Sequence, residues 1–362
     1  MVDEVFKPLM TAHGIPGLAV GISHAGVRHL FHYGVASRET GQPVDANTLF
    51  EIGSLSKTLT ATFAGYAHEA RRISLDAAAA EYVPELRGSP IGRATLLQLG
   101  TYTAGGLPLQ FPEAVADTAA ALRFLREFQP TAQPGTRRRY SNPSIGLLGH
   151  AAARAIGREF AEASEAELFP RLRLAQTFIR VPPLAGASYA WGYDKAMRPI
   201  RVNPGAFDAE AYGVKSTAAD MLRFVEANLR PASLEPVMRR AVERTHEGRF
   251  RVGPMVQGLG WEQYPWPVGV DMLLDGNSSA MALEAHAAEA LRPAAGLHGN
   301  RLFNKTGSTN GFGCYAAFVP GLDIGIVMLA NKNFPNAARV GAAHVVLTTL
   351  LSARSGRGSA RS

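Results

Sequence analysis

Cysteine is almost absent from this chain of 362 residues: Cys314 is the only one, which excludes an internal disulfide bond. It lies in the apolar segment GFGCYAAFVP, where a small buried strand residue is the expected interpretation and a catalytic thiol is the alternative. The chain also lacks any apolar run near the ~18 residues that a membrane-spanning helix needs. We therefore expect a globular protein without contact with a membrane, built as one large domain or two interlocked ones.

Motifs that would indicate other kinds of enzyme, or a nucleic-acid partner, are missing. The sequence has no HExxH-like motif and no Cys/His cluster, and His29 and His32 lie three apart on a predicted strand, so they point to opposite faces. It has no Gly-x-Ser-x-Gly nucleophile elbow. The net charge is +7, but the basic residues are scattered, and the one dense run, residues 137–139, is either solvated or a source of positive potential. We expect no metal, no organic cofactor and no nucleic-acid partner.

Lysine is scarce, because only six of the 37 basic residues are lysine. Arginine keeps its proton at any working pH, whereas lysine can lose one and act as a base. The few positions that carry lysine are therefore worth attention. Two of them, Lys57 and Lys305, lie in segments with further chemically active residues.

The first such segment is FEIGSLSKTLTATF, which contains Ser54-x-x-Lys57 at the predicted start of a buried helix. Positions i and i+3 share a helix face, so the Lys57 amine can lie beside the Ser54 hydroxyl. The free N–H groups of the helix start favour negative charge developing at Ser54. The alternative is that Ser54 is an ordinary helix cap.

Two later segments carry groups that complement this pair. In RRRYSNPSIGLLG, Tyr140 supplies a phenol that ionises more easily beside cations, and Asn142 supplies both a donor and an acceptor. In NKTGSTNGFG, a strand carries Lys305 and Thr306 as donors for an anion, and Gly307 allows a substrate edge to lie close to the strand. The N–H of the next residue, Ser308, could form an oxyanion hole with the N–H of Ser54.

The order of elements predicts an α+β fold. Helical spacing covers 2–12, two strands form a hairpin over 17–37, and 73–215 is expected to be mostly helix with long loops. Three strands follow near the end, in NRLFNKTG, FGCYAAFVP and DIGIVMLAN, and then a C-terminal helix from 336. Strands at both ends predict one antiparallel sheet built from both termini and flanked by helices. We expect a lobe formed by 1–72 and about 216–362, an inserted, mainly helical lobe of about 73–215, a cleft between them and a disordered tail over 353–362.

A serine with a lysine, then a tyrosine or serine motif, then a Lys-Thr-Gly strand, in this order, is typical of penicillin-recognising serine enzymes. Longer segments follow the same order: TYTAGGLPLQ, YSNPSIGLLG, DAEAYGVKS, QGLGWE, NKTGSTNGFG and GIVMLANKNFPN. Through them nearly the whole chain resembles a class C (AmpC-type) serine β-lactamase. The resemblance implies the two-lobed β-lactamase fold, cephalosporins and penicillins as substrates, no cofactor, a monomer, and export to the periplasm with a leader peptide removed.

The resemblance also implies how the catalytic residues act. Ser54 attacks the lactam carbonyl and becomes acylated, with Lys57 or Tyr140 as the general base. Tyr140, held by Lys57 and Lys305, would help to activate the water that releases the product. The oxyanion hole would consist of the N–H groups of Ser54 and Ser308.

Other residues would hold the antibiotic. Asn142 and Gln110 would bind its acylamide side chain, and Tyr212 would line the pocket near that side chain. Glu262 would be a charge partner for the lysines and the tyrosine. The substrate carboxylate would be faced by Lys305, Thr306 and Asn336.

Some features depart from the family pattern and leave alternatives open. Asn304 stands where some relatives have histidine, Asn310 stands where some have glycine, and segment 275–291, which we expect to flank the cleft, differs most. The same scaffold also carries carboxylesterases, D,D-peptidases and sensors that are acylated but never turn over. The acidic N-terminus MVDEVFKPLM lacks signal-peptide features, so the sequence by itself leaves a cytosolic protein and a processed mature form both possible.

Overall fold

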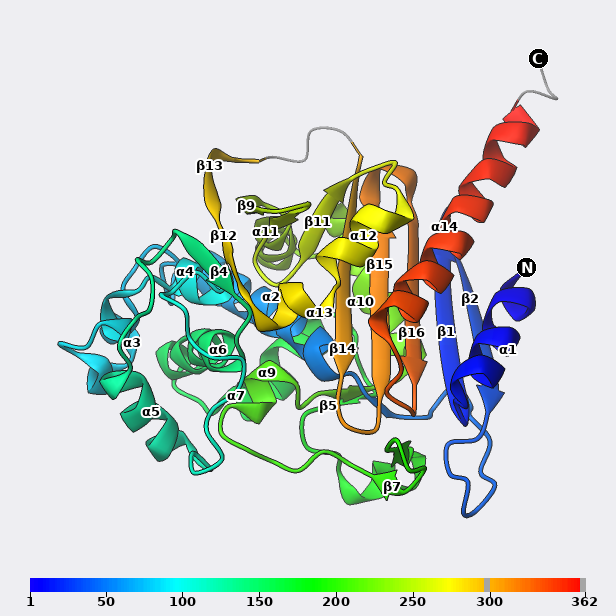
Figure 1. Cartoon of the computed structure of the whole chain (residues 1–362), viewed down its shortest axis with the longest axis horizontal. Coiled ribbons are helices and arrows are strands. Elements are labelled where there is room, and N and C mark those ends of the chain that lie inside the picture. The colour runs from blue at the N-terminus through cyan, green and yellow to red at the C-terminus, as the bar shows by residue number, and fades with distance from the viewer. Residues whose placement is uncertain (296–299, 359–362) are drawn as a thin grey trace.

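The largest element is a nine-stranded antiparallel sheet, within the residues that this computed structural model describes, 1–295 and 300–358 (Figure 1). Its strand order is β13-β9-β10-β11-β14-β15-β16-β1-β2. The strands are β1 (Gly17–His24), β2 (Val27–Gly34), β9 (Gly248–Val252), β10 (Met255–Gln257), β11 (Glu262–Pro265), β13 (Glu289–Ala295), β14 (Arg301–Ser308), β15 (Gly313–Val319) and β16 (Ile324–Ala330). The N-terminal hairpin thus joins the three C-terminal strands through pairing of β1 with β16.

Helices cover both faces of this sheet. Every residue of β15 and β16 is buried, which is typical of a sheet packed on both sides. Successive strand residues therefore enter two separate cores, as Ala19 and Val20 do. One face packs against α1 (Val2–His13) and α14 (Asn336–Gly358), and the other against α2 (Ser56–Glu69), α10 (Ala218–Leu229) and α11 (Pro236–Thr245).

The segment after α2 is rich in short helices and long loops, which lie to one side of the sheet (Figure 1). Its helices are α3 (Ala79–Tyr82), α4 (Leu96–Gly100), α5 (Thr118–Glu127), α6 (Asn142–Ile156), α7 (Phe160–Ala163), α8 (Phe169–Arg171) and α9 (Asp208–Ala211). Short strands form three small sheets: β3 (Phe50–Glu51) with β8 (Lys215–Ser216) and β5 (Thr177–Phe178), β6 (Gly192–Tyr193) with β7 (Pro199–Ile200), and β4 (Arg137–Arg139) with β12 (Ala285–Ala287). The helices α12 (Val270–Gly276) and α13 (Ser279–Leu283) precede β12.

The predicted α+β class and the sheet built from both termini are confirmed, as are the first helix, the hairpin and the three last strands. The sequence analysis did not predict β9, β10, β11 and β13, which add four strands to one side of the sheet, or β12, which pairs with β4. The C-terminal helix α14 reaches Gly358, into the segment where we expected a disordered tail, and residues 359–362 lie outside the described residues.

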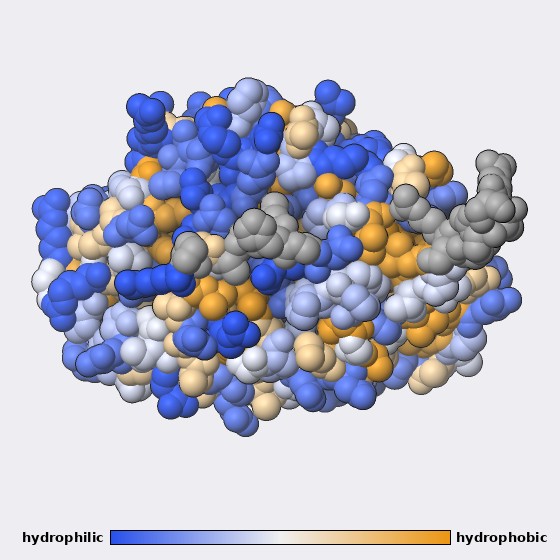
Figure 2. All heavy atoms as spheres, turned by 90° about the horizontal axis from the view of Figure 1, so that it is seen from above, coloured by the Kyte–Doolittle hydropathy of each residue, from blue (hydrophilic) through white to orange (hydrophobic). Residues whose placement is uncertain are grey.

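Hydrophilic and hydrophobic residues alternate in small patches over the face seen in Figure 2. None of the helices within the described ranges is long and apolar enough to cross a membrane.

The one cysteine, Cys314, is buried in β15, and burial raises the pKa of its thiol to about 12. It is therefore the inert strand residue that was expected, because the thiolate and not the thiol is the reactive form.

Candidate active site

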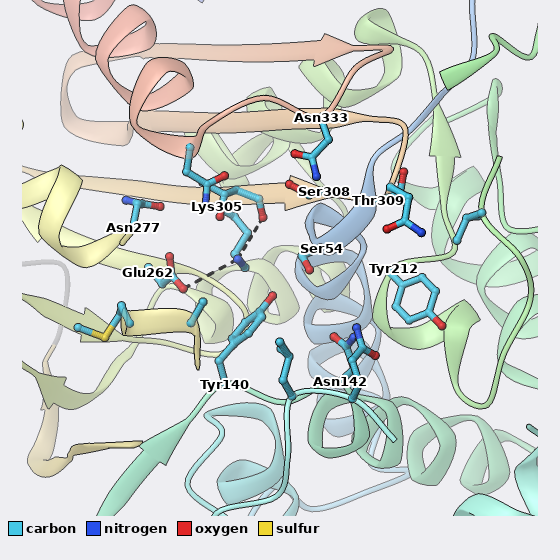
Figure 3. A pocket seen from close by; sticks show the side chains of 18 of the residues that line it. Ser54, Tyr140, Asn142, Tyr212, Glu262, Asn277, Lys305, Ser308, Thr309 and Asn333 are labelled. Atoms are coloured by element: carbon cyan, nitrogen blue, oxygen red, sulfur yellow. Dashed lines mark hydrogen bonds and ion pairs between the residues drawn. The ribbon is translucent and has the colours of Figure 1, made fainter. Parts of the chain in front are cut away.

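A cleft of about 530 Å³ brings together most of the residues singled out in the sequence (Figure 3). This volume is in the usual range for a small-molecule site. Lys57 lies directly beneath the cleft, and Gly307 lies between two lining residues of β14. The predicted residues that line it are Ser54, Gln110, Tyr140, Asn142, Tyr212, Glu262, Lys305, Thr306, Ser308 and Asn336.

Ser54 lies in a 3₁₀ turn, Gly53–Leu55, that leads into α2. Neither the turn nor the helix has a side-chain cap hydrogen bond, so Ser54 does not serve as the cap that the sequence left open. Its Oγ instead accepts a hydrogen bond of 2.9 Å from the Lys57 Nζ. The i, i+3 spacing places the two side chains on one face, as expected.

Lys57 is fully buried, and its Nζ also donates to the Ala211 carbonyl at 2.7 Å. Burial lowers the pKa of Lys57 to about 8, with a further lowering by the charge of Lys305, while Tyr140 and Glu262 act in the opposite direction. A lysine with this pKa is partly unprotonated near neutrality. It can therefore take a proton from the hydroxyl it contacts.

Tyr140 lies between two ammonium groups. The Nζ of Lys305 is 4.8 Å from the centre of its ring, and that of Lys57 is 5.2 Å away. Burial raises the pKa of the phenol, but the charges of Lys305 and Lys57 outweigh this, so its pKa is lowered overall. Its hydroxyl is buried and has no hydrogen-bond partner among the described residues. The phenol therefore loses its proton more easily than a free tyrosine does.

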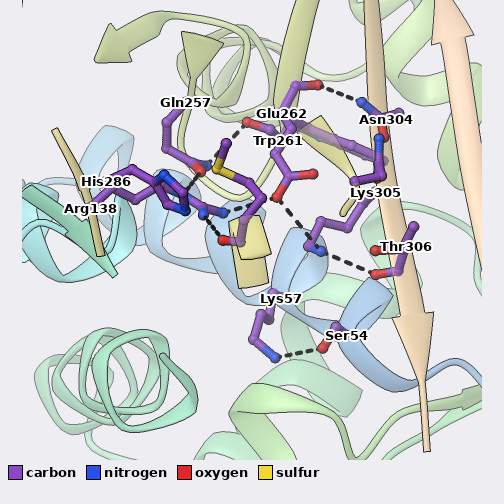
Figure 4. A network of polar contacts seen from close by, with 12 residues as sticks. Ser54, Lys57, Arg138, Gln257, Trp261, Glu262, His286, Asn304, Lys305 and Thr306 are labelled. Atoms are coloured by element: carbon purple, nitrogen blue, oxygen red, sulfur yellow. Dashed lines mark hydrogen bonds and ion pairs between the residues drawn. The ribbon is translucent and has the colours of Figure 1, made fainter. Parts of the chain in front are cut away.

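A buried ion-pair network lies behind Lys305 (Figure 4). The Glu262 carboxylate is 3.9 Å from the Lys305 Nζ and 3.1 Å from the Arg138 guanidinium. Arg138 is 1% exposed and also donates to Gln257 Oε1 and to the Met281 carbonyl, both at 2.8 Å. Glu262 thus offsets part of the positive charge around Tyr140 without touching it.

The three arginines at 137–139 differ in burial, because side chains alternate between the two faces of a strand. It forms β4, in which Arg137 is exposed, Arg138 is buried and Arg139 is half-buried. The solvated interpretation therefore fits Arg137, but not Arg138, which the sequence analysis missed as part of the site.

The turn that carries Ser54 packs closely against β14, and each of the two segments has a glycine at the contact. A Cβ at Gly53, whose φ is +52°, would lie 2.5 Å from the amide nitrogen of Ser308. A Cβ at Gly307 would lie 2.1 Å from the carbonyl oxygen of Ile52. Only glycine allows both approaches, which place the backbone of Ser54 beside that of Ser308.

Tyr140 and Asn142 are held by the start of α6. Ser141 is the helix N-cap, and its Oγ accepts from the N–H of Ser144 at 3.1 Å. The Asn142 amide group donates to Gln110 Oε1 at 2.8 Å, so these two predicted substrate residues are already joined. The Asn142 Oδ1 is buried and has no partner within the described ranges, which leaves an acceptor free for a ligand N–H.

Other lining residues were outside the motifs. Segment 275–291 flanks the cleft as expected and contributes Asn277, Ser278 and Met281 among others. A second wall, missed in the sequence, is formed by residues 200–203, at the end of β7 and in the loop that follows it. Asn304 does not line the cleft and is fully buried, with its amide donating to the Glu262 carbonyl at 3.4 Å. Among the described residues, no group of three or more His, Cys, Asp or Glu side chains could hold a metal ion.

Comparison with known proteins agrees with this geometry. A sequence model of the beta-lactamase family matches residues 2–351, so the chain belongs to the beta-lactamase family. A beta-lactamase of Pseudomonas fluorescens is 49% identical over 350 residues, which is 97% of this chain and 98% of the relative.

Solved structures narrow the placement to class C. The class C beta-lactamase of Rhodobacter sphaeroides superposes with a TM-score of 0.93 at 46% identity, covering 97% of this chain and 99% of that one. A beta-lactamase/D-alanine carboxypeptidase of Pseudomonas syringae gives a TM-score of 0.94 at 46% identity, over 96% and 97% of the two chains. The chain is thus a class C member of the family, a hydrolase with the β-lactamase fold.

Proposed function

We propose that this protein hydrolyses the β-lactam amide of cephalosporins and penicillins through a covalent acyl-serine intermediate. The observation that carries the proposal is the buried Lys57 in hydrogen bond with Ser54 Oγ, next to a phenol whose pKa two lysine charges lower. This arrangement supplies a nucleophile and two candidate acceptors for its proton: Lys57, whose pKa is about 8, and Tyr140, whose pKa is lowered.

In acylation, the Ser54 Oγ attacks the lactam carbonyl while its proton passes to Lys57 or Tyr140. The carbonyl oxygen becomes an oxyanion, which the N–H groups of Ser54 and Ser308 stabilise. The intermediate then collapses: the carbon–nitrogen bond breaks, the lactam nitrogen takes up the proton, and an ester to Ser54 remains. In deacylation, Tyr140 takes a proton from a water whose oxygen attacks the ester carbonyl. The bond between this carbon and Ser54 Oγ then breaks, Oγ takes up the proton, and the product acid leaves.

The remaining cleft residues would orient the antibiotic. Asn142 and Gln110 would bind its acylamide side chain near Tyr212, and Gly307 would let that edge lie against β14. The carboxylate would face Lys305, Thr306 and Asn336. Since Lys305 is paired only loosely with Glu262, at 3.9 Å, its charge is available to a ligand carboxylate.

We also propose the division into a lobe of 1–72 with about 216–362 and a lobe of about 73–215, a monomer, and function in the periplasm. The sheet with α1, α2, α10, α11 and α14 on its faces, and the short helices to one side, support the division.

A second candidate function is D-alanine carboxypeptidase activity, because the Pseudomonas syringae relative carries both names. This activity would use the same serine, lysine and tyrosine on an acyl-D-Ala-D-Ala peptide.

The decisive experiment follows a chromogenic cephalosporin in the presence of purified protein. We expect many turnovers per protein molecule. A single stoichiometric burst would instead indicate a sensor, and no lactam cleavage with rapid release of D-alanine or rapid ester cleavage would indicate a peptidase or an esterase.

Two serine variants provide the control. Ser54→Ala should abolish turnover and leave the unfolding midpoint nearly unchanged, because its hydroxyl caps no helix. Ser56→Ala should keep turnover and lower stability instead, because the buried Ser56 Oγ accepts from the N–H of Val214 at 3.2 Å and does not line the cleft. Turnover that survives in Ser54→Ala would contradict the mechanism.

A further inference from the structure

A buried carboxylate that does not line the cleft joins two of its walls. Glu51, at the end of β3, is 1% exposed and lies three residues before Ser54 in the chain. Its Oε1 accepts from the Tyr189 hydroxyl at 2.6 Å and from the Val202 N–H at 2.7 Å. Its Oε2 accepts from the Thr309 hydroxyl at 2.5 Å. Three donors from distant parts of the chain therefore converge on this one side chain.

These donors belong to different parts of the site. Val202 lies in the wall formed by residues 200–203. Just beyond this wall, Gly205 lies close to the hydroxyl of Tyr212. Thr309 directly follows Ser308 at the end of β14 and also lines the cleft. One carboxylate therefore fixes the distance between the 200–203 wall and the strand end that carries the proposed oxyanion donor.

The neighbouring residue of the wall, Arg201, packs against Tyr189, which is one of the donors to Glu51. The Arg201 guanidinium stacks over the rings of Tyr189 and Trp191, at 3.8 and 4.2 Å from their centres, and donates to the carbonyls of Tyr189 and Ala190. The backbone at Tyr189 is tied to the strand leading to Glu51, since the Ala190 N–H donates to the Leu49 carbonyl at 3.0 Å. Several contacts thus hold Tyr189 in place, whereas the Val202 N–H is held by its hydrogen bond to Glu51.

We propose that Glu51 is a positioning residue that sets the width of the cleft between residues 200–203 and Thr309, and thereby decides the preference between β-lactams with small and large amide side chains. The proposal rests on the proposed function, since it assigns this wall to the amide side chain. Without the carboxylate, Val202 loses its link to the end of β14, although Ile200 stays paired with β6. This part of the wall then yields to a large side chain, while a small substrate is held less firmly.

The variants separate this role from a general loss of stability. Glu51→Ala removes the acceptor from all three donors, and Tyr189→Phe removes one donor but keeps the ring that stacks on Arg201. Glu51→Gln keeps an acceptor for Tyr189 and Val202 and can donate to Thr309. The matched control is Glu226→Ala, because Glu226 is also a buried carboxylate with hydrogen-bonded partners, Ser23 and Arg28, but lies on α10 away from the cleft.

Two measurements test the proposal. The first is hydrogen exchange at the Val202 amide, which needs no substrate and should become at least tenfold faster in Glu51→Ala, with little change in Glu226→Ala. The second is the ratio of kcat/KM for a cephalosporin with a bulky amide side chain to that for one with a small side chain. This ratio should rise at least tenfold in Glu51→Ala, severalfold in Tyr189→Phe and less than twofold in Glu51→Gln and Glu226→Ala.

The outcomes distinguish the two proposals. If the unaltered protein cleaves no β-lactam, the proposed function fails, and the exchange of the Val202 amide still decides whether Glu51 holds the wall. If it cleaves β-lactams and the ratio is the same in Glu51→Ala and Tyr189→Phe, Glu51 does not set the preference. If Glu51→Ala does not fold, Tyr189→Phe alone decides, and an unchanged ratio in that variant overturns the proposal.

Discussion

Replacing Lys305 with methionine tests whether a lysine charge prepares the phenol of Tyr140 to lose its proton. The Lys305 ammonium is 4.8 Å from the centre of the Tyr140 ring, and Lys305 is 3% exposed, so solvent screens this interaction poorly. At an effective dielectric constant of ~20, two unit charges 4.8 Å apart interact by ~3.5 kcal/mol, which sets the scale of this effect. Methionine is unbranched and uncharged, so we expect Lys305→Met to raise the pKa of Tyr140.

Ultraviolet titration of tyrosinate measures this change without any substrate. Burial raises the pKa of other tyrosines such as Tyr102 and Tyr264, whereas that of Tyr140 is lowered, so the Tyr140 step should come at lower pH than theirs. This step should disappear in Tyr140→Phe and move to higher pH in Lys305→Met. Thr306→Val, which removes a neighbouring donor but no charge, should leave it in place.

The rate of acylation should follow the same direction. If Tyr140 is the base for acylation, the rate rises as it loses its proton, and the low-pH limb of the pH–rate profile moves to higher pH when the pKa of Tyr140 is raised. A tyrosinate step at the same pH in Lys305→Met and in the unaltered protein would refute the electrostatic argument, whatever the rates do.

Three further predictions concern the buried cations. Lys57→Arg should reduce turnover of a chromogenic cephalosporin by at least ~100-fold, because arginine cannot act as a base; a rate near that of the unaltered protein would remove Lys57 from the mechanism. The unaltered protein should gain activity as the pH rises towards 8, since the pKa of Lys57 is about 8 and its amine loses the proton over this range. Arg138→Met should lower the free energy of unfolding, measured with denaturant, by ~3–5 kcal/mol, because Glu262 loses its closest buried partner. Adding Glu262→Gln to that variant should restore part of the loss; fully additive losses would show that the pair is not coupled.

The elements with clear periodicity were predictable from the sequence, and the strands with mixed patterns were not. The segments that form β1, β2, β15 and β16 are apolar or alternate regularly, and short turns bound them. The strands β10, β11 and β12 have only three or four residues each, and the alternation in β9 covers five, so no pattern is long enough to mark a strand in the sequence. Which strands pair across the sheet depends on contacts between distant segments, which no local pattern contains.

The candidate site was predictable where a motif places residues close in sequence. Ser54 and Lys57 are one helical turn apart, and Lys305 to Ser308 share one strand, so spacing was enough. Arg138 could not be assigned, because its burial depends on β10, β11 and the Met281 carbonyl, all more than 100 residues away in sequence. Glu51 lay within the first motif and still went unnoticed, because its partners Tyr189, Val202 and Thr309 come from two other segments of the chain.

The pairing of β1 with β16 has a consequence for biosynthesis. The Gly17 N–H donates to the side chain of Asn331, which is 314 residues later. A ribosome that adds ~5–20 residues per second needs roughly 15 to 60 s to make the intervening chain. During that time the nascent hairpin of β1 and β2 has no β16 to pair with, and the strand that carries Lys305 is among the last to emerge. The site can therefore assemble only at the end of translation, so a nascent chain remains open to chaperones or a translocation channel until then.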